Sequence, residues 1–152
     1  MLIENLQQDL RQSQLDKDEA KVNTLRLLLS EISYAKIKKN GGEDQELSDD
    51  EVVSIIQKEV KKRKEAADGF RQGDREESAL KEEAEAEILS KYLPQQLSDE
   101  QLNSMIDEAI AQTGAVAISD MGKVIGIVMG KVKGQADGAR ISSLVKEKLG
   151  KS

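Results

Sequence analysis

The residues best suited to a specific interaction lie near the C-terminus. Glycine recurs there every four residues and lysines stand between the glycines: Gly122, Gly126, Gly130, Gly134 and Gly138, with Lys123, Lys131 and Lys133. Lysine ammonium groups bind phosphates, and a row of glycines on a helix lets another backbone come close. The pattern indicates binding, with a nucleic-acid backbone or a partner helix as the approaching chain.

The chain lacks the residue types on which most autonomous catalysis depends. It contains no Cys and no His, so it has no thiolate nucleophile, no Ser-His-Asp triad and no imidazole ligand for zinc. Phosphate-binding loops of the GxxxxGK[ST] or GxGxxG type do not occur. The 29 Asp and Glu residues are typical of a solvated helical surface. We therefore expect no catalytic residue, no metal and no cofactor.

Charge is distributed unevenly along the sequence. Residues 1–93 and 94–118 carry net charges of −6 and −4, whereas residues 119–152 carry +4. A basic segment in an acidic protein attracts phosphate backbones, although charge alone does not distinguish it from a chance surface patch. The basic residues of this segment are Lys123, Lys131, Lys133, Arg140, Lys146, Lys148 and Lys151.

Composition and apolar spacing predict an all-α fold. Strong helix formers dominate, with one Pro, one Phe, two Tyr and no Trp. In the first half we expect four helices, over about 2–15, 18–39, 49–72 and 76–92. Asn40-Gly41-Gly42 ends the second, and the capping box Ser48–Glu51 begins the third. The apolar faces expected for the third and fourth helices are Val52, Val53, Ile56, Val60, Ala67 and Phe70, and Leu80, Ala84, Ile88 and Leu89.

A cluster of cations lies in the middle of the third predicted helix. It consists of Lys58, Lys61, Lys62, Arg63 and Lys64. Glu59 is placed to pair with Arg63, and Lys61 with Glu65, at the spacing of four residues that brings side chains together on a helix. We interpret this cluster as a solvated helix face.

The only proline, Pro94, marks the expected boundary between a four-helix part, residues 1–93, and a smaller three-helix part, residues 97–152. In the second part a capping box at Ser98–Gln101 begins one helix and Gly114 ends it. Ser119-Asp120 and Asp137 are the expected N-caps of the last two helices. A helix over 121–132 collects its Val, Ile and Met residues on one side and its glycines on the other, with the geometry beyond Met129 left open.

Nothing in the sequence indicates a membrane. The N-terminus lacks the apolar segment of a signal peptide, and no stretch approaches the roughly 18 apolar residues of a spanning helix. We expect a cytoplasmic protein.

Three segments resemble the YqeY-like family: Lys91–Ser98, Asp120–Gly126 and Lys131–Gly138. That family shares its domain with the C-terminal part of GatB, the tRNA-binding subunit of the glutamine-dependent aminoacyl-tRNA amidotransferase. The resemblance implies a two-part all-α fold and a tail that holds tRNA. It also implies that any carbon–nitrogen ligase activity belongs to a partner, either amidotransferase subunits or an aminoacyl-tRNA synthetase. One departure is Gly130, where proline is common in the family.

Three hypotheses follow. The first is a stand-alone relative of the GatB tail that binds tRNA and assists or modulates tRNA-dependent amidation. The second is a helical protein–protein adaptor without a nucleic-acid role, and the third is an autonomous enzyme, which the missing residue types argue against. For the first, the residues expected to face RNA are Gly122, Lys123, Gly126, Lys131, Lys133, Gly134, Gly138 and Arg140.

Overall fold

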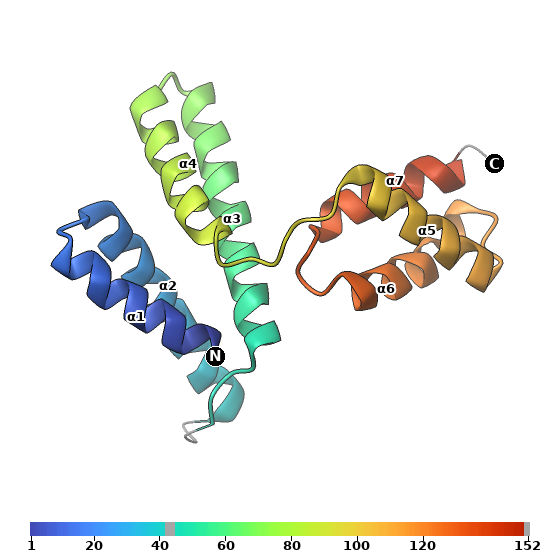
Figure 1. Cartoon of the computed structure of the whole chain (residues 1–152). Helices are drawn as coiled ribbons and strands as arrows, with labels where there is room; N and C mark the ends of the chain where they lie inside the picture. Colours follow the sequence, from blue (N-terminus) through green and yellow to red (C-terminus); the bar gives the residue numbers. More distant parts are fainter. Residues whose placement is uncertain (42–44, 151–152) are drawn as a thin grey trace. The chain divides into compact units, whose positions relative to one another are not determined.

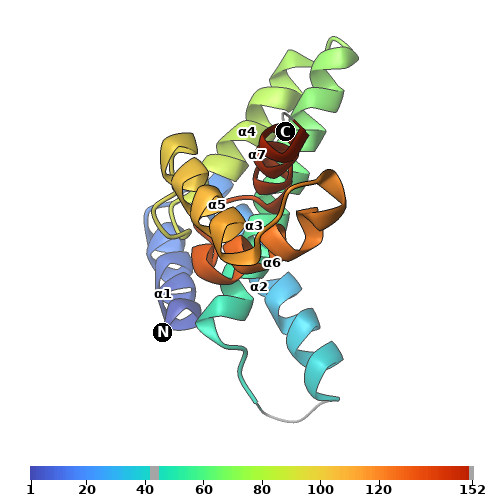
Figure 2. The ribbon, with the colours of Figure 1, turned by 90° about the vertical axis from the view of Figure 1, so that its right-hand side faces the viewer.

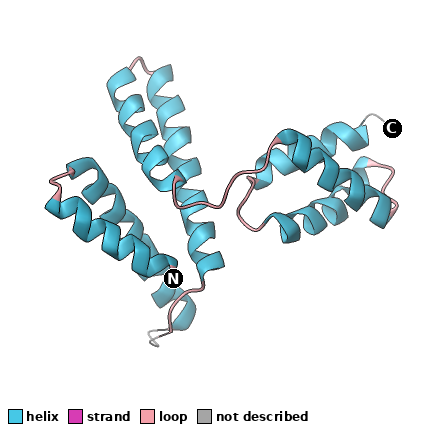
Figure 3. Cartoon of the chain, viewed as in Figure 1, coloured by secondary structure: helices cyan, strands magenta, loops and turns pink. Residues whose placement is uncertain are grey.

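The computed structural model describes residues 1–41 and 45–150, and α-helices make up most of this part (Figures 1 and 3). No strand occurs in the described residues, so the predicted all-α class is confirmed. The chain divides into two compact units, Met1–Leu93 (unit 1) and Pro94–Ser152 (unit 2). Unit 1 contains α1 (Leu2–Leu15), α2 (Glu19–Asn40), α3 (Asp49–Gln72) and α4 (Glu76–Ser90); unit 2 contains α5 (Asp99–Thr113), the 3-10 turn η1 (Ile118–Asp120), α6 (Met121–Val132) and α7 (Gly138–Gly150).

Local signals in the sequence set several helix ends. Both predicted capping boxes form: the Glu51 amide donates to Ser48 Oγ at 3.2 Å, and the Gln101 amide donates to Ser98 Oγ at the same distance. The Lys39 ammonium, followed by the Ser48 amide, holds the pKa of Glu51 below its usual value. Gly41 ends α2 with a φ of +59°, in the left-handed region that glycine adopts readily. Gly42 lies outside the described residues.

The core of unit 1 is aliphatic. Side chains from all four helices are buried in it, among them Leu6, Leu25, Leu28, Ile56 and Leu89. Helices α3 and α4 run side by side, as both views show (Figures 1 and 2). Toward the tip of this hairpin the buried residues are small, namely Ala67 and Ala79. Short side chains let the two helix axes approach closely, so the tip is held by tight backbone packing.

Arg63 corrects the prediction of a solvated basic face on α3. Its side chain is buried, and it bridges two carboxylates: Nη1 lies 2.7 Å from Glu59 Oε2, and Nε lies 3.3 Å from Glu85 Oε2. The Glu59 pair was expected, whereas the Glu85 pair joins α3 to α4 across 22 residues of sequence. Lys61 and Glu65 are exposed, and no ion pair joins them in the described part of the chain.

The apolar face predicted for α4 is also wrong in part. Leu80 is 54% exposed and Ala84 is exposed, while the helix buries Ala79, Ala86 and Leu89. Ala79 and Ala86 lie seven residues apart on one side of α4, and that side is buried together with Leu89. Glu85 lies next to this side, where it pairs with Arg63 of α3, and helical spacing leaves Leu80 facing outward. On α3, Val53 and Phe70 are half-buried and not part of the core.

Tyr92 fastens the end of unit 1 to its first helix. The helix α4 ends at Ser90, two residues before the predicted end, so Tyr92 lies in the turn that follows. Its hydroxyl donates to Asp9 Oδ2 at 2.5 Å. Burial, and then the Asp9 carboxylate, raise the pKa of Tyr92 well above its usual value. Tyr92 and Leu93 both pack against the aliphatic core, so they belong to unit 1.

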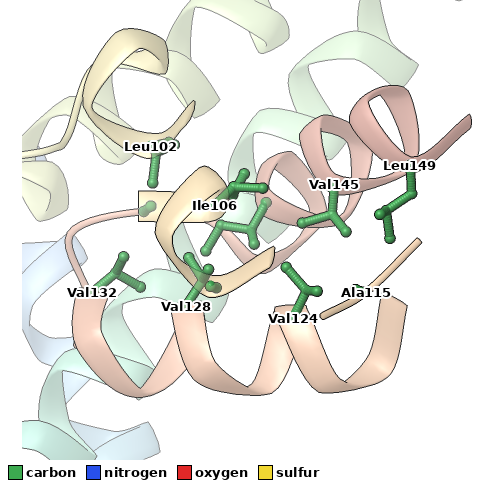
Figure 4. Close-up of a cluster of buried hydrophobic side chains, with 11 residues drawn as sticks. Leu102, Ile106, Ala115, Val124, Val128, Val132, Val145 and Leu149 are labelled. Carbon is green, nitrogen blue, oxygen red and sulfur yellow. The ribbon is translucent and has the colours of Figure 1, made fainter. Parts of the chain in front are cut away.

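Unit 2 has a separate core made by its three helices. Leu102 and Ile106 of α5, Val128 of α6, and Ile141 and Val145 of α7 are completely buried (Figure 4). Asp120 corrects one prediction in this unit. Its carboxylate accepts from the Val116 and Ala117 amides at 3.2 and 3.3 Å, which closes η1. It therefore makes no side-chain cap on α6.

Replacing Arg63 with methionine keeps the aliphatic bulk and leaves Glu59 and Glu85 facing each other without a cation. We expect the free energy of unfolding of unit 1 to fall by about 2–3 kcal/mol, somewhat less than for a fully buried pair because both carboxylates stay 15% exposed. Both tyrosines of the chain, Tyr34 and Tyr92, lie in unit 1. Tyrosine fluorescence during urea unfolding therefore reports this unit alone.

The control for this experiment is Arg71→Met, which removes ion pairs to Glu76 and Glu83 at the exposed tip of the same hairpin. Surface pairs contribute little, so the loss should be much smaller. Adding Glu59→Gln and Glu85→Gln to the Arg63→Met variant should restore part of the stability, since the uncompensated charges are gone. Equal losses for Arg63→Met and Arg71→Met would contradict the role assigned to Arg63.

Candidate nucleic-acid interface

The orientation of α6 is fixed by the side it buries. Val124, Val128 and Val132 recur every four residues and are at most 1% exposed. They point toward the core side chains of α5 and α7 (Figure 4). At about 100° per residue, this stripe leaves the opposite side of the helix facing out.

Three glycines occupy that outer side and form what we call the glycine strip: Gly122, Gly126 and Gly130. All three are exposed, and a Cβ atom built at any of them would meet nothing within 4 Å. No other described residue of unit 2 therefore uses the strip for close packing. A solvent-facing glycine in a helix costs roughly 1 kcal/mol relative to alanine, so stability alone does not account for three of them.

Lys123 and Lys131 of α6 and Lys133 at its end are exposed. None of the three forms an ion pair with any residue that the structure describes. Helical geometry places Lys123 at the border of the strip and Lys131 nearer the buried side. Free ammonium groups next to an accessible backbone are suited to phosphate contacts.

The sequence left open where the helix ends after Met129. In the structure α6 continues past Gly130 to Val132. It then turns sharply: Lys133 has a φ of +36° and Gly134 a φ of +88°. Side-chain and backbone hydrogen bonds hold this turn, because Gln96 Nε2 donates to the Gly134 carbonyl at 3.1 Å and the Leu97 amide donates to the Gln135 carbonyl at 2.8 Å. Lys133 is thus presented by a supported turn.

The two predicted site residues on α7 are placed differently. Arg140 forms an ion pair with Asp99 of α5, which raises the pKa of Arg140. Gly138 lies against Met129, whose Cε atom would be 3.5 Å from an added Cβ. Asp137 Oδ1 accepts from the Ala139 amide at 3.1 Å, which is the N-cap role expected for it. On α6, Lys123 therefore lies with the glycine strip, whereas Arg140 is engaged by Asp99 and Gly138 packs on Met129.

Gln96 and Leu97 were not among the predicted site residues. They fall in the Lys91–Ser98 segment that carried the family resemblance, but nothing in their types indicates that they support the turn after α6. Lys148, another cation of the basic segment, pairs with Asp107 at 2.6 Å. Lys151 lies outside the described residues.

Within residues 1–41 and 45–150, no group of three or more Asp and Glu side chains is placed to hold a metal ion. The same part of the chain has no helix that is both long and apolar enough to cross a membrane.

Comparison with known protein families decides the ancestry of the chain. The sequence pattern of the Yqey-like protein family matches residues 3–149. The chain belongs to the YqeY-like family. The match extends over both units, so the three resembling segments reflect a relationship along nearly the whole sequence.

Two fungal proteins illustrate the relatives of this YqeY-like chain. An uncharacterised protein of Schizosaccharomyces pombe is 35% identical over 101 residues, which is 64% of this chain and 79% of the relative. A protein of Pyrenophora tritici-repentis named altered inheritance of mitochondria protein 41, mitochondrial, is 26% identical over 153 residues, covering 99% of this chain and 82% of the relative.

Substituting Gly126 tests whether the glycine strip is free of packing. We expect Gly126→Ala to raise the free energy of unfolding of unit 2 by about 0.5–1 kcal/mol, because alanine favours the helix and its Cβ meets nothing. Gly134→Ala serves as the contrast. It should lower the free energy of unfolding of unit 2 by about 1 kcal/mol, because Gly134 has a positive φ. Hydrogen exchange of amides in α5, α6 and α7 measures both changes. A loss of stability in Gly126→Ala would show that another element packs on the strip.

Proposed function

We propose that this YqeY-like protein binds structured RNA through the outer side of α6, with tRNA as its ligand, and that it assists or modulates tRNA-dependent amidation. The observation that carries the proposal is the glycine strip, which is open to solvent and bordered by Lys123. Lys131 and Lys133 are exposed at the C-terminal end of the helix, and none of the three lysines has an ion-pair partner among the described residues. The relationship of the family to the tail of GatB supports tRNA as the RNA.

The chemistry of the interface divides between the two residue types. Lys123, Lys131 and Lys133 supply charge for phosphates, and the strip lets the ribose–phosphate chain lie against the helix without side chains in between. Arg140 is a secondary contact in this proposal, because its guanidinium must first leave Asp99. The acidic unit 1, with its net charge of −6, disfavours contact with RNA and confines binding to the basic end of the chain.

Catalysis is assigned to a partner in this proposal. The sequence contains neither Cys nor His, and we assign no catalytic role to any residue of the chain. Amidotransferase subunits or an aminoacyl-tRNA synthetase are the proposed partners, since they act on the same tRNA. We place this function in the cytoplasm. The word mitochondrial in the name of the Pyrenophora relative concerns that protein.

A second function is favoured by the same observation. An open strip of small residues also suits close packing of a helix from another protein, which would make the chain a protein–protein adaptor. This alternative gives the lysines no necessary role, so charge substitutions distinguish the two functions.

Replacing Lys123, Lys131 and Lys133 together with glutamine should weaken tRNA binding and flatten its dependence on salt. For each phosphate that the variant no longer neutralises, the slope of log affinity against log salt falls by about 1. Fluorescence anisotropy with a full tRNA and a generic duplex of equal charge, each at two salt concentrations, measures both quantities. The unsubstituted protein should prefer tRNA at near-physiological salt.

Lys58, Lys61 and Lys62 provide a matched control, because they are exposed lysines of α3 in unit 1. Replacing these three with glutamine changes the net charge equally and should leave tRNA binding nearly unchanged. If both triple variants lowered tRNA affinity equally, the binding would be general electrostatic attraction and not a site on α6. Weak, salt-sensitive binding that is the same for tRNA and duplex would remove the RNA function and favour the adaptor.

A further inference from the structure

Helix α2 is apolar on two sides. Its inner side buries Leu25, Leu28 and Ile32 in the core of unit 1. On its outer side, Tyr34 is 68% exposed and Ile37 is 61% exposed. A helix that is apolar on more than one face is normally covered on both. The described residues of unit 1 leave this outer side uncovered.

The outer side of α2 forms one wall of an elongated groove, which we call the α1–α2 groove. Two adjoining hollows make it up, and both are lined by Arg26. The first also contains Leu10 of α1, with Leu29 and Ile37 of α2; the second extends to Gln14 of α1 and Glu19 of α2. From Glu19 to Ile37 a helix rises about 27 Å, or five turns. This shape fits a helix better than a compact small molecule.

Charge along the groove selects the kind of helix. Arg26 stands where the two hollows join, is exposed, and has no ion-pair partner among the residues that the structure describes. Lys17 lines the far end, and Glu19 is the one acidic side chain among the described residues of the lining. A guanidinium at the centre of a largely apolar groove favours a carboxylate on the bound partner, because the planar fork binds carboxylates in a bidentate manner.

We propose that the α1–α2 groove binds an amphipathic helix of a protein partner, with apolar residues every three or four positions and an acidic side chain opposite Arg26. Leu10, Leu29, Tyr34 and Ile37 receive the apolar side of that helix, and Arg26 receives its carboxylate. This is the helix-in-groove mode of recognition. A second copy of the chain fits less well, because two such grooves facing each other bring Arg26 and Lys17 of both copies together and, among the described lining residues, supply only one carboxylate, Glu19, from each.

The experiment uses the full-length protein and three synthetic helical peptides of about 20 residues, long enough to span the groove. All three carry leucines every three or four positions. They differ only at one central position beside the leucines, which is Glu in the first peptide, Gln in the second and Lys in the third. Fluorescence anisotropy should show the Glu peptide binding about tenfold tighter than the Lys peptide, the effect of one charge-assisted hydrogen bond. Arg26→Gln should abolish the preference for the Glu peptide. Ile37→Ser should lower the affinity of the protein for all three peptides.

Two matched control variants test whether the peptides bind at the groove and not elsewhere on unit 1. Lys81→Gln removes an exposed cation of α4, and Leu80→Ser removes an exposed apolar side chain of the same helix; neither should change peptide binding. Equal or absent binding of all three peptides would overturn the proposal. So would a dimer in analytical ultracentrifugation that Ile37→Ser dissociates, since a second copy would then occupy the groove. No RNA is present, so the outcome is independent of the RNA function proposed for unit 2.

Discussion

Burial of one valine stripe, Val124, Val128 and Val132, determines the architecture of unit 2. The three side chains lie between α5 and α7, and their removal from water fixes the rotation of α6 about its axis. With that rotation fixed, the glycine strip must face outward and Lys123 must border it. The proposed interface therefore needs no mobile loop to form it. It is the solvent side of a helix whose other side is held by the core.

Unit 1 depends on a different balance of forces. Its aliphatic core lies where all four helices meet, while the outer part of the α3–α4 hairpin is held by alanine packing and by Arg63 between two carboxylates. A buried ion pair is weak support for stability compared with apolar packing, but leaving one of its charges without a partner is costly. Most acidic residues of the chain also lie in unit 1, which carries a net charge of −6, whereas the basic residues 119–152 of unit 2 carry +4. A polyanion is therefore attracted to that segment and repelled by unit 1.

The sequence predicted the features that depend on neighbouring residues. The capping boxes at Ser48 and Ser98 and the glycine that ends α2 depend on positions within four residues of each other, and all are present. The predicted apolar side of α6 is confirmed for its valines, which recur every four residues, but Met129, predicted on the same side, is 42% exposed. Another local error concerns Asp120, whose carboxylate accepts from amides three and four residues before it and does not cap α6. The other errors concern contacts between distant residues. Arg63 meets Glu85 across 22 positions and Arg140 meets Asp99 across 41. Helical spacing does not contain that information, so the buried side of α4 and the pairing of Arg140 could not be predicted.

In the function proposed for unit 2, the outer side of α6 stays bare so that an RNA backbone can lie against it. Replacing Gly122, Gly126 and Gly130 together with alanine tests this most directly, because no charge changes and each Cβ enters open space. We expect the triple variant to have a more stable unit 2 and an affinity for tRNA clearly lower than that of the unsubstituted protein. A variant that gains stability and binds tRNA with unchanged affinity would contradict the proposed function.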